Sequence, residues 1–384
     1  MNRILFWFLP IFLVLGFFLG NSRSGPRESA QDASKASPPS SNEMEPIQVA
    51  KDGHGFIGTP SGRRFTPWGL NYGHEGKLIE DFWEDHWSRV VQDFQDMKAL
   101  GANVVRVHLQ FGKFMEGPAR PNPKALHRLG RLLRLAETTG LYLDLTGLGC
   151  YRKADIPSWY DRLSEEDRWS VQARFWSAVA ARCGRSPAVF CYDLMNEPIV
   201  PGGQRKPGEW YSGKTLGGYD FVQFITLDPH GRPRDQIARQ WIQRLTHAIR
   251  EHDRRHLITV GLLPWIPQWG HLSGFVPETV GPELDFLSVH IYPNQGKVDE
   301  ALMGLKKFAV GKPVVIEETF PLACSPTELE EFLKQSRGIA CGWMGHYDGM
   351  TLQQLQALRK AQTITTGQAM YLGWLELFRR LEPK

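Results

Sequence analysis

The sequence predicts a (β/α)8 TIM barrel, because short apolar strand patterns alternate with helical patterns through a single domain. Eight runs are rich in β-branched or other apolar residues, and they occupy positions 65–71, 103–109, 141–145, 189–195, 256–261, 286–290, 313–317 and 338–345. A barrel of this class takes about 250 residues, and the chain has 384. An open, doubly wound sheet is the alternative, but no glycine-rich phosphate loop follows any of the eight runs. We therefore expect one closed barrel without internal repeats.

The segments between these runs carry the signals of amphipathic helices. Apolar residues from Trp83 to Leu100 fall on one helical face, and a leucine-rich helix ends at Gly140. Ser164 stands where a capping residue would open the helix that follows. A turn of Pro, Ser and Gly within residues 54–65 predicts a small hairpin that closes the bottom of the domain. Further helices are expected near 235–252, 299–308, 327–336 and 366–381.

The first 48 residues are expected to lie outside the folded domain. Residues 4–20 form an apolar run of 17 residues behind a single Arg3, a length between that of a signal-peptide core and a minimal membrane span. Residues 1–20 are therefore expected to be a signal peptide or an N-terminal membrane anchor, and no evident cleavage signal decides between the two. Residues 21–48 are rich in serine, proline and charge, which predicts a flexible linker before a folded domain at 49–384. Both alternatives predict an exported protein, extracellular or periplasmic, that is secreted or tethered to the membrane.

Charge and cysteine content argue against several classes of function. The formal net charge is +4, with 45 basic and 41 acidic residues and no basic stripe, so nothing indicates a nucleic-acid partner. The five cysteines show no metal-binding spacing, and we interpret them as structural thiols. The sequence therefore predicts neither a metal nor another cofactor, and we expect a monomer.

Two glutamates stand at the ends of predicted strands. Glu197 follows the apolar run 189–195 within the sequence Asn-Glu-Pro, and Glu318 ends the β-branched run that starts at Pro313. In a (β/α)8 barrel the carboxyl ends of the strands meet at the face that carries the active site. Paired carboxylates that flank a sugar bond are the machinery of glycoside hydrolysis. The two side chains therefore predict a shared cleft with glycosidase chemistry.

Other polar residues lie at the ends of different predicted strands, namely Asn71, Arg106, His108, Asn196, His290, Tyr292 and Glu317. Each could be structural by itself, as a buried ion-pair partner or a satisfied core histidine, but their joint placement favours one site. Two long loops at 201–234 and 262–284 carry several aromatic residues, which favours a binding cleft over surface filler. Adjacent residues of a strand face opposite sides. Only Glu317 or Glu318 can therefore face the interior directly, and the spacing from Pro313 favours Glu318.

In the order and spacing of these residues the chain resembles glycoside hydrolase family 5, the cellulase and mannanase family of retaining barrels. The matching motifs are Gly69-Leu-Asn71, Asn103-Val-Val-Arg106, Asn196-Glu-Pro198, His290-Ile-Tyr292 and Lys312-Pro-Val-Val-Ile-Glu-Glu318. The resemblance implies that Glu197 is the acid/base and Glu318 the nucleophile of a double displacement. It also implies that Asn196 binds the sugar 2-hydroxyl and that Arg106 and Tyr292 align the nucleophile. His290 would line the same subsite.

Three positions depart from the usual pattern of this family. Glu317 precedes the expected nucleophile where a small residue is common, and the third predicted strand lacks the histidine of many cellulase-like members. Trp343 in the eighth predicted strand is the candidate sugar platform, although that tryptophan often falls later, where Gly345, His346 and Tyr347 stand. We therefore expect a metal-free retaining hydrolase of a β-linked glycan, with mannan favoured over β-glucan. The alternatives are a catalytically inactive carbohydrate-binding barrel and an exo-acting β-glycosidase on short oligosaccharides.

Overall fold

The computed structural model describes residues 44–213 and 218–383, and Glu45–Lys384 form one compact unit. The expected signal peptide or anchor at 1–20, and the expected linker as far as residue 43, lie outside the described residues. Within the described part of the chain, no helix combines the length and the apolar character needed to cross a bilayer.

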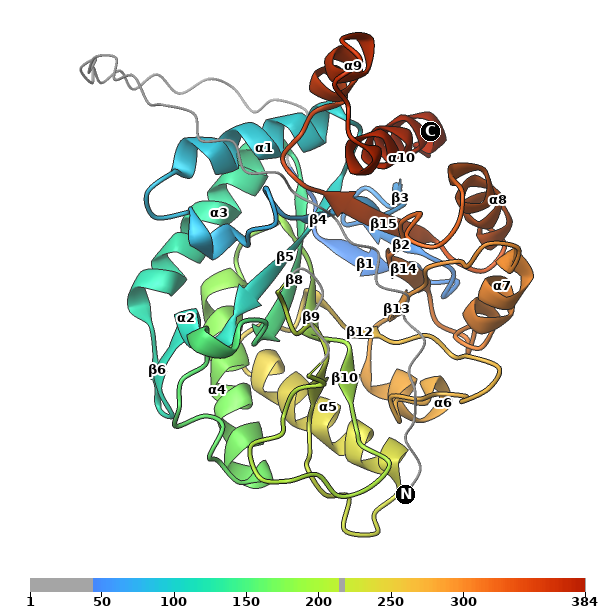
Figure 1. Ribbon diagram of the computed structural model, residues 1–384. Helices are drawn as coiled ribbons and strands as arrows, with labels where there is room; N and C mark the ends of the chain where they lie inside the picture. The colour runs from blue at the N-terminus through green and yellow to red at the C-terminus, as the bar shows by residue number, and fades with distance from the viewer. Residues whose placement is uncertain (1–43, 214–217, 384) are drawn as a thin grey trace, which may run out of the picture. The chain divides into compact units, whose positions relative to one another are not determined.

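Eight parallel strands close into a barrel, as the sequence predicts (Figure 1). Around the ring the order is β12, β13, β14, β15, β4, β5, β8 and β9, so the last barrel strand in the sequence pairs with the first. The closed ring rules out the open, doubly wound sheet. The strands are β4 (Trp68–Tyr72), β5 (Val104–Gln110), β8 (Tyr142–Gly149), β9 (Val189–Asn196), β12 (Leu257–Leu262), β13 (Leu287–His290), β14 (Val314–Glu318) and β15 (Gly342–Tyr347).

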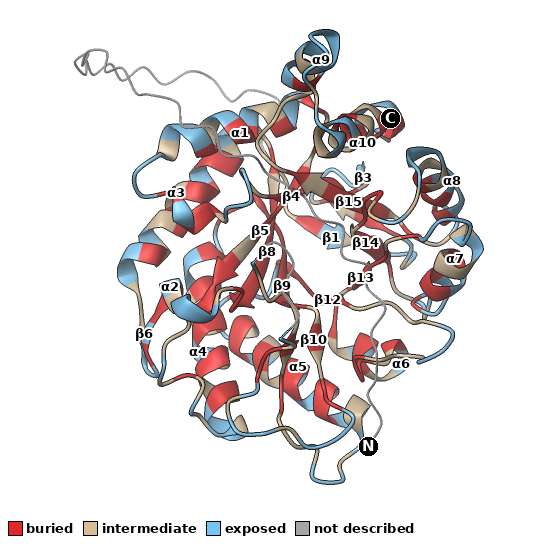
Figure 2. Cartoon of the chain, viewed as in Figure 1, coloured by how far each residue is buried: buried red, intermediate tan, exposed pale blue. Residues whose placement is uncertain are grey.

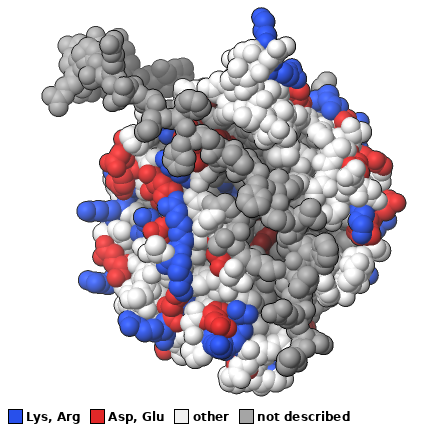
Figure 3. All heavy atoms as spheres, viewed as in Figure 1, with Lys and Arg blue, Asp and Glu red and all other residues white. Residues whose placement is uncertain are grey.

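Helices surround the barrel, with buried faces toward the strands and exposed faces outward (Figure 2). Local signals set their ends: Gly140 ends α3 with φ 65°, and Ser164 accepts the backbone N–H of Asp167 at the start of α4, as predicted. Basic and acidic side chains are interspersed over the face shown in Figure 3. The longer helices are α1 (Trp87–Ala99), α3 (Pro123–Thr139), α4 (Glu165–Cys183), α5 (Arg234–Arg250), α7 (Val298–Lys306), α8 (Pro326–Ser336), α9 (Leu352–Lys360) and α10 (Thr366–Leu381).

The connections also contain short elements that the sequence patterns do not predict. One of these unpredicted elements is the helix α9. Thr351 caps it by accepting a hydrogen bond from the backbone N–H of Gln354 over 3.2 Å. The remaining ones are α2 (Phe111–Phe114), α6 (Pro277–Val280), β6 (Met115–Gly117), β7 (Arg120–Pro121), β10 (Pro198–Ile199) and β11 (Gln223–Phe224), with 3-10 turns at Ile79–Asp81, Lys153–Asp155 and Gly281–Glu283.

A three-stranded antiparallel sheet seals the N-terminal end of the barrel. It consists of β1 (Ile47–Val49), β2 (Phe56–Gly58) and β3 (Arg64–Phe65), so the predicted hairpin is confirmed. Phe56 is fully buried, and its ring contacts the rings of Phe190 and Phe286 at 5.2 Å in edge-on geometry. The folded unit begins earlier than expected, because Ile47 pairs with Gly58. Residues 45–48 therefore belong to the domain and not to the linker.

The barrel interior is layered from apolar to charged. Val104, Cys191, Val315 and Met344 pack on Phe56 in the lowest layer. Above them lies a layer of fully buried charged side chains, which belong to Arg106, Asp144, Asp193 and Glu317. Charged groups are costly to bury unless they are paired. Their position directly beneath the carboxyl ends of the strands indicates that they support a functional site.

Candidate active site

Glu197 and Glu318 face each other at the C-terminal mouth of the barrel. Glu318 is the last residue of β14, and Glu197 directly follows β9 with φ 46°, in the left-handed region of the backbone. One carboxylate oxygen of each residue and one ring nitrogen of His290 all lie within 4.8 Å of one another. The exposed fraction is 15% for the Glu197 side chain and 12% for the Glu318 side chain. A left-handed non-glycine residue costs roughly 1–3 kcal/mol, and such residues cluster at functional sites.

Glu318 is held as an ionised carboxylate. Arg106 Nη1 donates to its Oε1 over 2.5 Å, and Tyr292 OH donates to its Oε2 over 2.6 Å. Burial by itself would raise the pKa of Glu318, but the positive charges of His290 and Arg106 outweigh burial and hold that pKa below its ordinary value. Glu318 is therefore charged at neutral pH and aligned through both of its oxygens.

Arg106 is fixed by residues of the neighbouring strands. Its Nη1 also donates to Asn71 Oδ1 over 2.8 Å. Its Nη2 donates to Asp193 Oδ2 over 2.7 Å and to Asn196 Oδ1 over 3.0 Å. The amide of Asn71 is oriented in turn, because it donates to two backbone carbonyls over 2.9 Å each. The guanidinium thus presents a permanent, fixed cation to Glu318.

His290 connects the two facing glutamates to the charged layer below. Its Nδ1 lies 2.9 Å from Glu197 Oε1 and 3.5 Å from Glu318 Oε2, and its Nε2 lies 3.3 Å from Glu317 Oε2. Burial would lower the pKa of His290, but the three carboxylates around it raise that pKa to about 10. His290 is therefore a cation at neutral pH. Among the described residues Arg106 bonds Glu318 and not Glu197, so the two facing carboxylates have different electrostatic settings.

Both glutamates of β14 face the barrel interior, which corrects the expectation that only one of them could do so. The pairing of β13 with β14 shifts by one residue at the strand end, so that His290 pairs with Glu318 instead of Glu317. Such a shift breaks the alternation of faces. Glu317 therefore points inward, fully buried and 3.6 Å from Arg106 Nη2. Glu318 keeps the rim position that the sequence predicts.

Asp144, Asp193 and Glu317 form a buried acidic layer beneath the site. One oxygen of each lies within 4.8 Å of the other two. Both oxygens of Asp144 and Oε1 of Glu317 have no hydrogen-bond partner among the described atoms. Burial, followed by the charges of Glu317 and Asp193, raises the pKa of Asp144 well above its ordinary value, which favours a proton on Asp144. Three such oxygens could also ligate a cation, but Arg106 already contacts the layer, and one proton reduces the remaining charge.

The eighth strand contributes His346, and not Trp343, to the site. Trp343 points outward, where its indole N–H donates to Ser336 Oγ of α8 over 2.8 Å. The expected sugar platform at Trp343 is therefore wrong, because Met344 is the neighbour that faces the barrel interior. Alternation then turns His346 inward, where its Nε2 lies 2.9 Å from Tyr292 OH and the two rings stack at 6.2 Å. If it were known which alternate residues of β15 face the interior, the sequence would indicate His346.

His108 and Tyr151 extend the site along β5 and β8. His108 Nε2 lies 3.4 Å from Arg106 Nη1, and His108 Nδ1 lies 2.6 Å from Tyr151 OH. Burial, and then the charge of Arg106, lowers the pKa of His108 well below its ordinary value, so the ring is neutral. Sequence analysis missed Tyr151, because the third predicted strand stops at residue 145, whereas β8 continues to Gly149.

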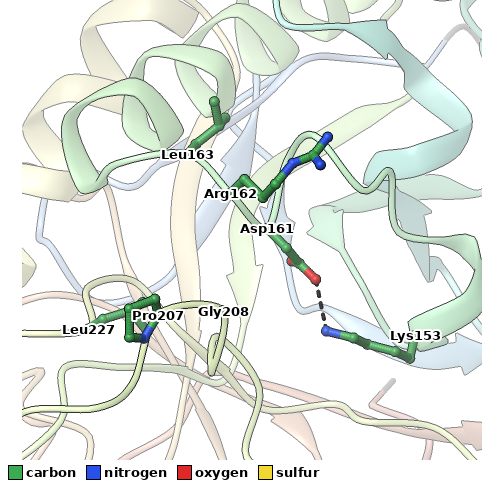
Figure 4. A pocket seen from close by; sticks show the side chains of 7 residues that line it. All are labelled: Lys153, Asp161, Arg162, Leu163, Pro207, Gly208 and Leu227. Carbon is green, nitrogen blue, oxygen red and sulfur yellow. Dashed lines mark hydrogen bonds and ion pairs between the residues drawn. The ribbon is translucent and has the colours of Figure 1, made fainter.

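A separate hollow of about 480 Å³ lies between the loop after β8 and the loop after β9 (Figure 4). An ion pair between Lys153 Nζ and Asp161 Oδ2, 2.8 Å apart, lies at its edge. None of the residues that line the hollow is one of the site residues described above. The loop after β9 does reach the site elsewhere, because Phe221 O accepts a hydrogen bond from Asn196 Nδ2 over 3.1 Å. The hollow is therefore distinct from the carboxylate site.

A closed (β/α)8 barrel with two facing carboxylates at its C-terminal mouth has the architecture of a carboxylate-dependent glycosidase. Residues 71–319 match the family model described as cellulase, glycosyl hydrolase family 5. The chain belongs to this family, so the resemblance of its motifs is confirmed.

Two relatives of the chain are described as mannan endo-1,4-β-mannosidases. A mannan endo-1,4-β-mannosidase A from Podospora anserina is 26% identical over 227 residues, which cover 51% of each chain. A mannan endo-1,4-β-mannosidase 2 from Arabidopsis thaliana is 28% identical over 140 residues, which cover 32% of this chain and 25% of the relative. The chain therefore spans about half of the length of the first relative and a quarter of the length of the second.

Solved structures share the fold at lower identity. An exo-β-1,4-mannosidase from Opitutaceae bacterium strain TAV5 superposes with a TM-score of 0.63 at 19% identity, covering 87% of this chain and 62% of that one. A β-1,4-D-mannanase from Cryptopygus antarcticus superposes with a TM-score of 0.61 at 16% identity, covering 88% and 95%. At this level of identity the likeness establishes the fold.

Proposed function

We propose that the protein is a retaining β-glycosidase in which Glu318 is the nucleophile and Glu197 the acid/base. The observation that carries the proposal is the carboxylate separation, because oxygens within 4.8 Å of each other fit retaining pairs, which stand about 5–5.5 Å apart. Inverting pairs stand about 6.5–9.5 Å apart to admit a water molecule. The cationic surroundings of Glu318 support its role as the ionised partner.

The proposed reaction has two halves. In the first, Glu318 attacks the anomeric carbon while Glu197 gives its proton to the glycosidic oxygen, so the C–O bond breaks and a glycosyl ester forms. In the second, Glu197 takes a proton from water, which attacks the same carbon and releases Glu318. Arg106 and Tyr292 stabilise the carboxylate that is released, and the His290 cation stabilises the ionised Glu197 that acts as the base.

The proposed substrate is a β-linked mannan, with β-glucan as the second candidate. Support comes from the relatives, of which two are mannan endo-1,4-β-mannosidases by description. The third barrel strand also lacks the histidine that cellulase-like members of the family carry. Asn196, at the edge of the site, is the residue proposed to bind the sugar 2-hydroxyl.

A panel of polysaccharides tests the proposal. The domain from residue 45 onward would be incubated with mannan, galactomannan, β-glucan, cellulose and xylan, and released reducing ends would be measured. We expect hydrolysis of mannans, and we expect Glu318→Ala to abolish it by several orders of magnitude. Hydrolysis that survives in Glu318→Ala would contradict the proposed nucleophile. A wild-type domain that binds glycans but cleaves none would favour the inactive carbohydrate-binding barrel.

We also infer that the protein works outside the cytoplasm, as a monomer that is secreted or tethered by residues 4–20. The apolar run at these positions supports this placement. Cell fractionation and N-terminal sequencing test it. A membrane-bound chain with an intact N-terminus would indicate an anchor, a soluble shortened chain would indicate a signal peptide, and a full-length cytoplasmic chain would contradict both.

A further inference from the structure

The rim of the barrel divides into two unequal arcs between the proposed catalytic residues. Glu197 follows β9 and Glu318 ends β14, and the short arc between these strands holds only β12 and β13. The long arc holds β15, β4, β5 and β8. The carboxylate of Glu318 has short-arc neighbours on one oxygen, namely His290 of β13 and Tyr292 just after it. Its other oxygen is bonded by Arg106 of the long arc, and Asn71 and His346, which bond Arg106 and Tyr292, also come from long-arc strands. The sugar that becomes attached to Glu318 is therefore expected to rest over the long arc.

Three loops meet along the long arc and form a continuous wall. Hydrogen bonds to the backbone N–H and C=O of Gly76 hold the three loops together. The backbone N–H of Gly76, in the loop after β4, donates to Asp348 Oδ1 in the loop after β15 over 2.9 Å. The hydroxyl of Tyr219, in the loop after β9, donates to the carbonyl oxygen of Gly76 over 2.6 Å. The loop after β9 thus crosses β8 and β5 and meets the loop after β4. We call Gly76, Asp348, Tyr219 and Arg152 the loop wall.

Within the loop wall, Arg152 bonds Tyr219 and a further residue, Asp81. Its Nη2 donates to Tyr219 OH over 2.9 Å, and its guanidinium lies 5.1 Å from the centre of the Tyr219 ring. Its Nη1 donates to Asp81 Oδ1 over 2.8 Å. Asp81 and Arg152 follow β4 and β8 respectively, so the ion pair ties a further loop into the wall. Four connections of the barrel are therefore held together on one side of the site.

An unbroken series of neighbouring side chains connects Arg106 in the site to Tyr219 in the loop wall. His108 lies 3.4 Å from Arg106, and Tyr151 OH lies 2.6 Å from His108. The ring of Phe221 lies 4.9 Å from the ring of Tyr151, and the rings of Phe221 and Tyr219 lie 5.6 Å apart. The series lines the long arc from the arginine that holds the nucleophile to the wall, so the wall adjoins the position expected for the attached sugar.

The short arc carries a different kind of loop. The residues after β12 form a turn closed by hydrogen bonds between Ile266 and Gly270. Trp269 at this turn is 45% exposed. The ammonium group of Lys307 lies 5.0 Å from the centre of the Trp265 ring. An exposed indole offers a flat apolar face on which a sugar ring can stack. This side of the site is therefore suited to the leaving portion of a chain.

We propose, on the basis of the function proposed above, that the loop wall closes the site one sugar beyond the cleavage point and makes the enzyme exo-acting. The enzyme would remove single sugars from the non-reducing end of β-linked oligosaccharides, and the remaining chain would extend over the short arc toward Trp269. A chain passing through the middle of the site would have to displace Tyr219 from Gly76. The chemistry remains the two-step displacement, with one monosaccharide released at each turnover.

Oligosaccharides labelled at the reducing end test this directly. β-1,4-Mannooligosaccharides of three to six units, carrying a fluorophore at the reducing end, would be digested and separated by length. We expect labelled products that shorten by one unit at a time, with free mannose and unchanged viscosity of a mannan solution. Early labelled products of mixed length with a rapid fall in viscosity would overturn the inference alone. No hydrolysis of any β-glycoside would overturn the proposed function and this inference with it.

Variants of the loop wall sharpen the test. Tyr219→Phe removes the hydrogen bond to Gly76, and Arg152→Ala removes the outer ion pair. In both we expect release of disaccharides to rise several-fold relative to monosaccharide. Lys153→Ala is the matched control, because the Lys153 side chain contacts Asp161 and Tyr211 and no residue of the loop wall, and its product lengths should equal those of the wild type. Disaccharide release that rises equally in Lys153→Ala would overturn the role of the wall.

Discussion

Replacing Glu317 with glutamine is expected to move the titration of His290 from about pH 10 into the neutral range. His290 faces Glu317 and Glu318 from β14, Glu197 from β9 and Arg106 from β5. The substitution keeps the size of the side chain and removes one negative charge from the Nε2 side of the ring. The His290 cation then loses the partner that lies deepest in the barrel.

The size of the change follows from the distance between the two groups. His290 Nε2 lies 3.3 Å from Glu317 Oε2, and two unit charges at this separation interact by about 5 kcal/mol at an effective dielectric constant near 20. One pKa unit corresponds to about 1.4 kcal/mol, so the pKa of His290 should fall by about 3.5 units. Glu318 and Glu197 still face the ring and keep the pKa from falling further.

Histidine-labelled protein followed by ¹⁵N NMR from pH 5 to pH 10 measures this change. The imidazole of His290 should stay protonated to about pH 9 in the wild type and should titrate near pH 6.5 in Glu317→Gln. Because a His290 cation supports the ionised Glu197, kcat in the variant should fall as the pH rises through the new pKa. An unchanged His290 titration in a folded Glu317→Gln protein would refute the electrostatic reasoning.

Asp144→Asn is the matched control for this experiment. The raised pKa of Asp144 favours its neutral form, so we expect the amide to change no charge and the pKa of His290 to remain high. The double variant with Glu317→Gln prevents Asp144 from ionising in place of Glu317. A large fall in the pKa of His290 in Asp144→Asn alone would show that Asp144 is charged and that the buried layer holds no proton.

Three further substitutions have expected outcomes. Glu197→Gln should slow hydrolysis of natural glycans roughly 100- to 10,000-fold but spare aryl glycosides with good leaving groups, which need little protonation; equal loss on both substrates argues against the acid role. Burial raises the pKa of Glu80 to about 7, so the folded protein keeps the proton on Glu80 to a higher pH than the unfolded chain does. The free energy of unfolding should therefore fall by about 3 kcal/mol between pH 4.5 and pH 8. Denaturation of Glu80→Gln should lack this decline. Trp343→Phe removes the bond to Ser336 and should lower the unfolding free energy by about 1 kcal/mol with kcat/KM unchanged, whereas loss of activity in a stable variant would restore Trp343 to the site.

The barrel itself could be predicted from the sequence because its signals are local. Each strand pattern is a short apolar or β-branched run, and helix ends are marked by single residues such as Gly140 and Ser164. Closure of the ring follows from the number and alternation of the elements. The hairpin that seals the barrel is predictable from its turn residues, and only the start of the strand that pairs with it, Ile47–Val49, lies within the expected linker.

The parts of the site that sequence analysis missed depend on neighbouring strands. Glu317 faces inward because the register of β13 against β14 shifts at His290, and a register shift is a property of two strands. The prediction that Trp343 faces the site is wrong because the run 338–345 does not reveal which of its alternate residues point into the barrel. The bond between Tyr219 and Gly76 joins residues 143 positions apart, and nothing in either local sequence indicates it.

Trapping of the covalent intermediate tests the proposed nucleophile most directly. The domain would be incubated with a 2-deoxy-2-fluoro-β-mannosyl fluoride, which forms the glycosyl ester and hydrolyses it slowly, and then digested for tandem mass spectrometry. One adduct per chain is expected, on Glu318. An adduct on Glu317 or Glu197 would contradict the assignment of the nucleophile. A protein that gains no adduct, and that gives product of inverted configuration from an ordinary β-glycoside, would contradict the double displacement.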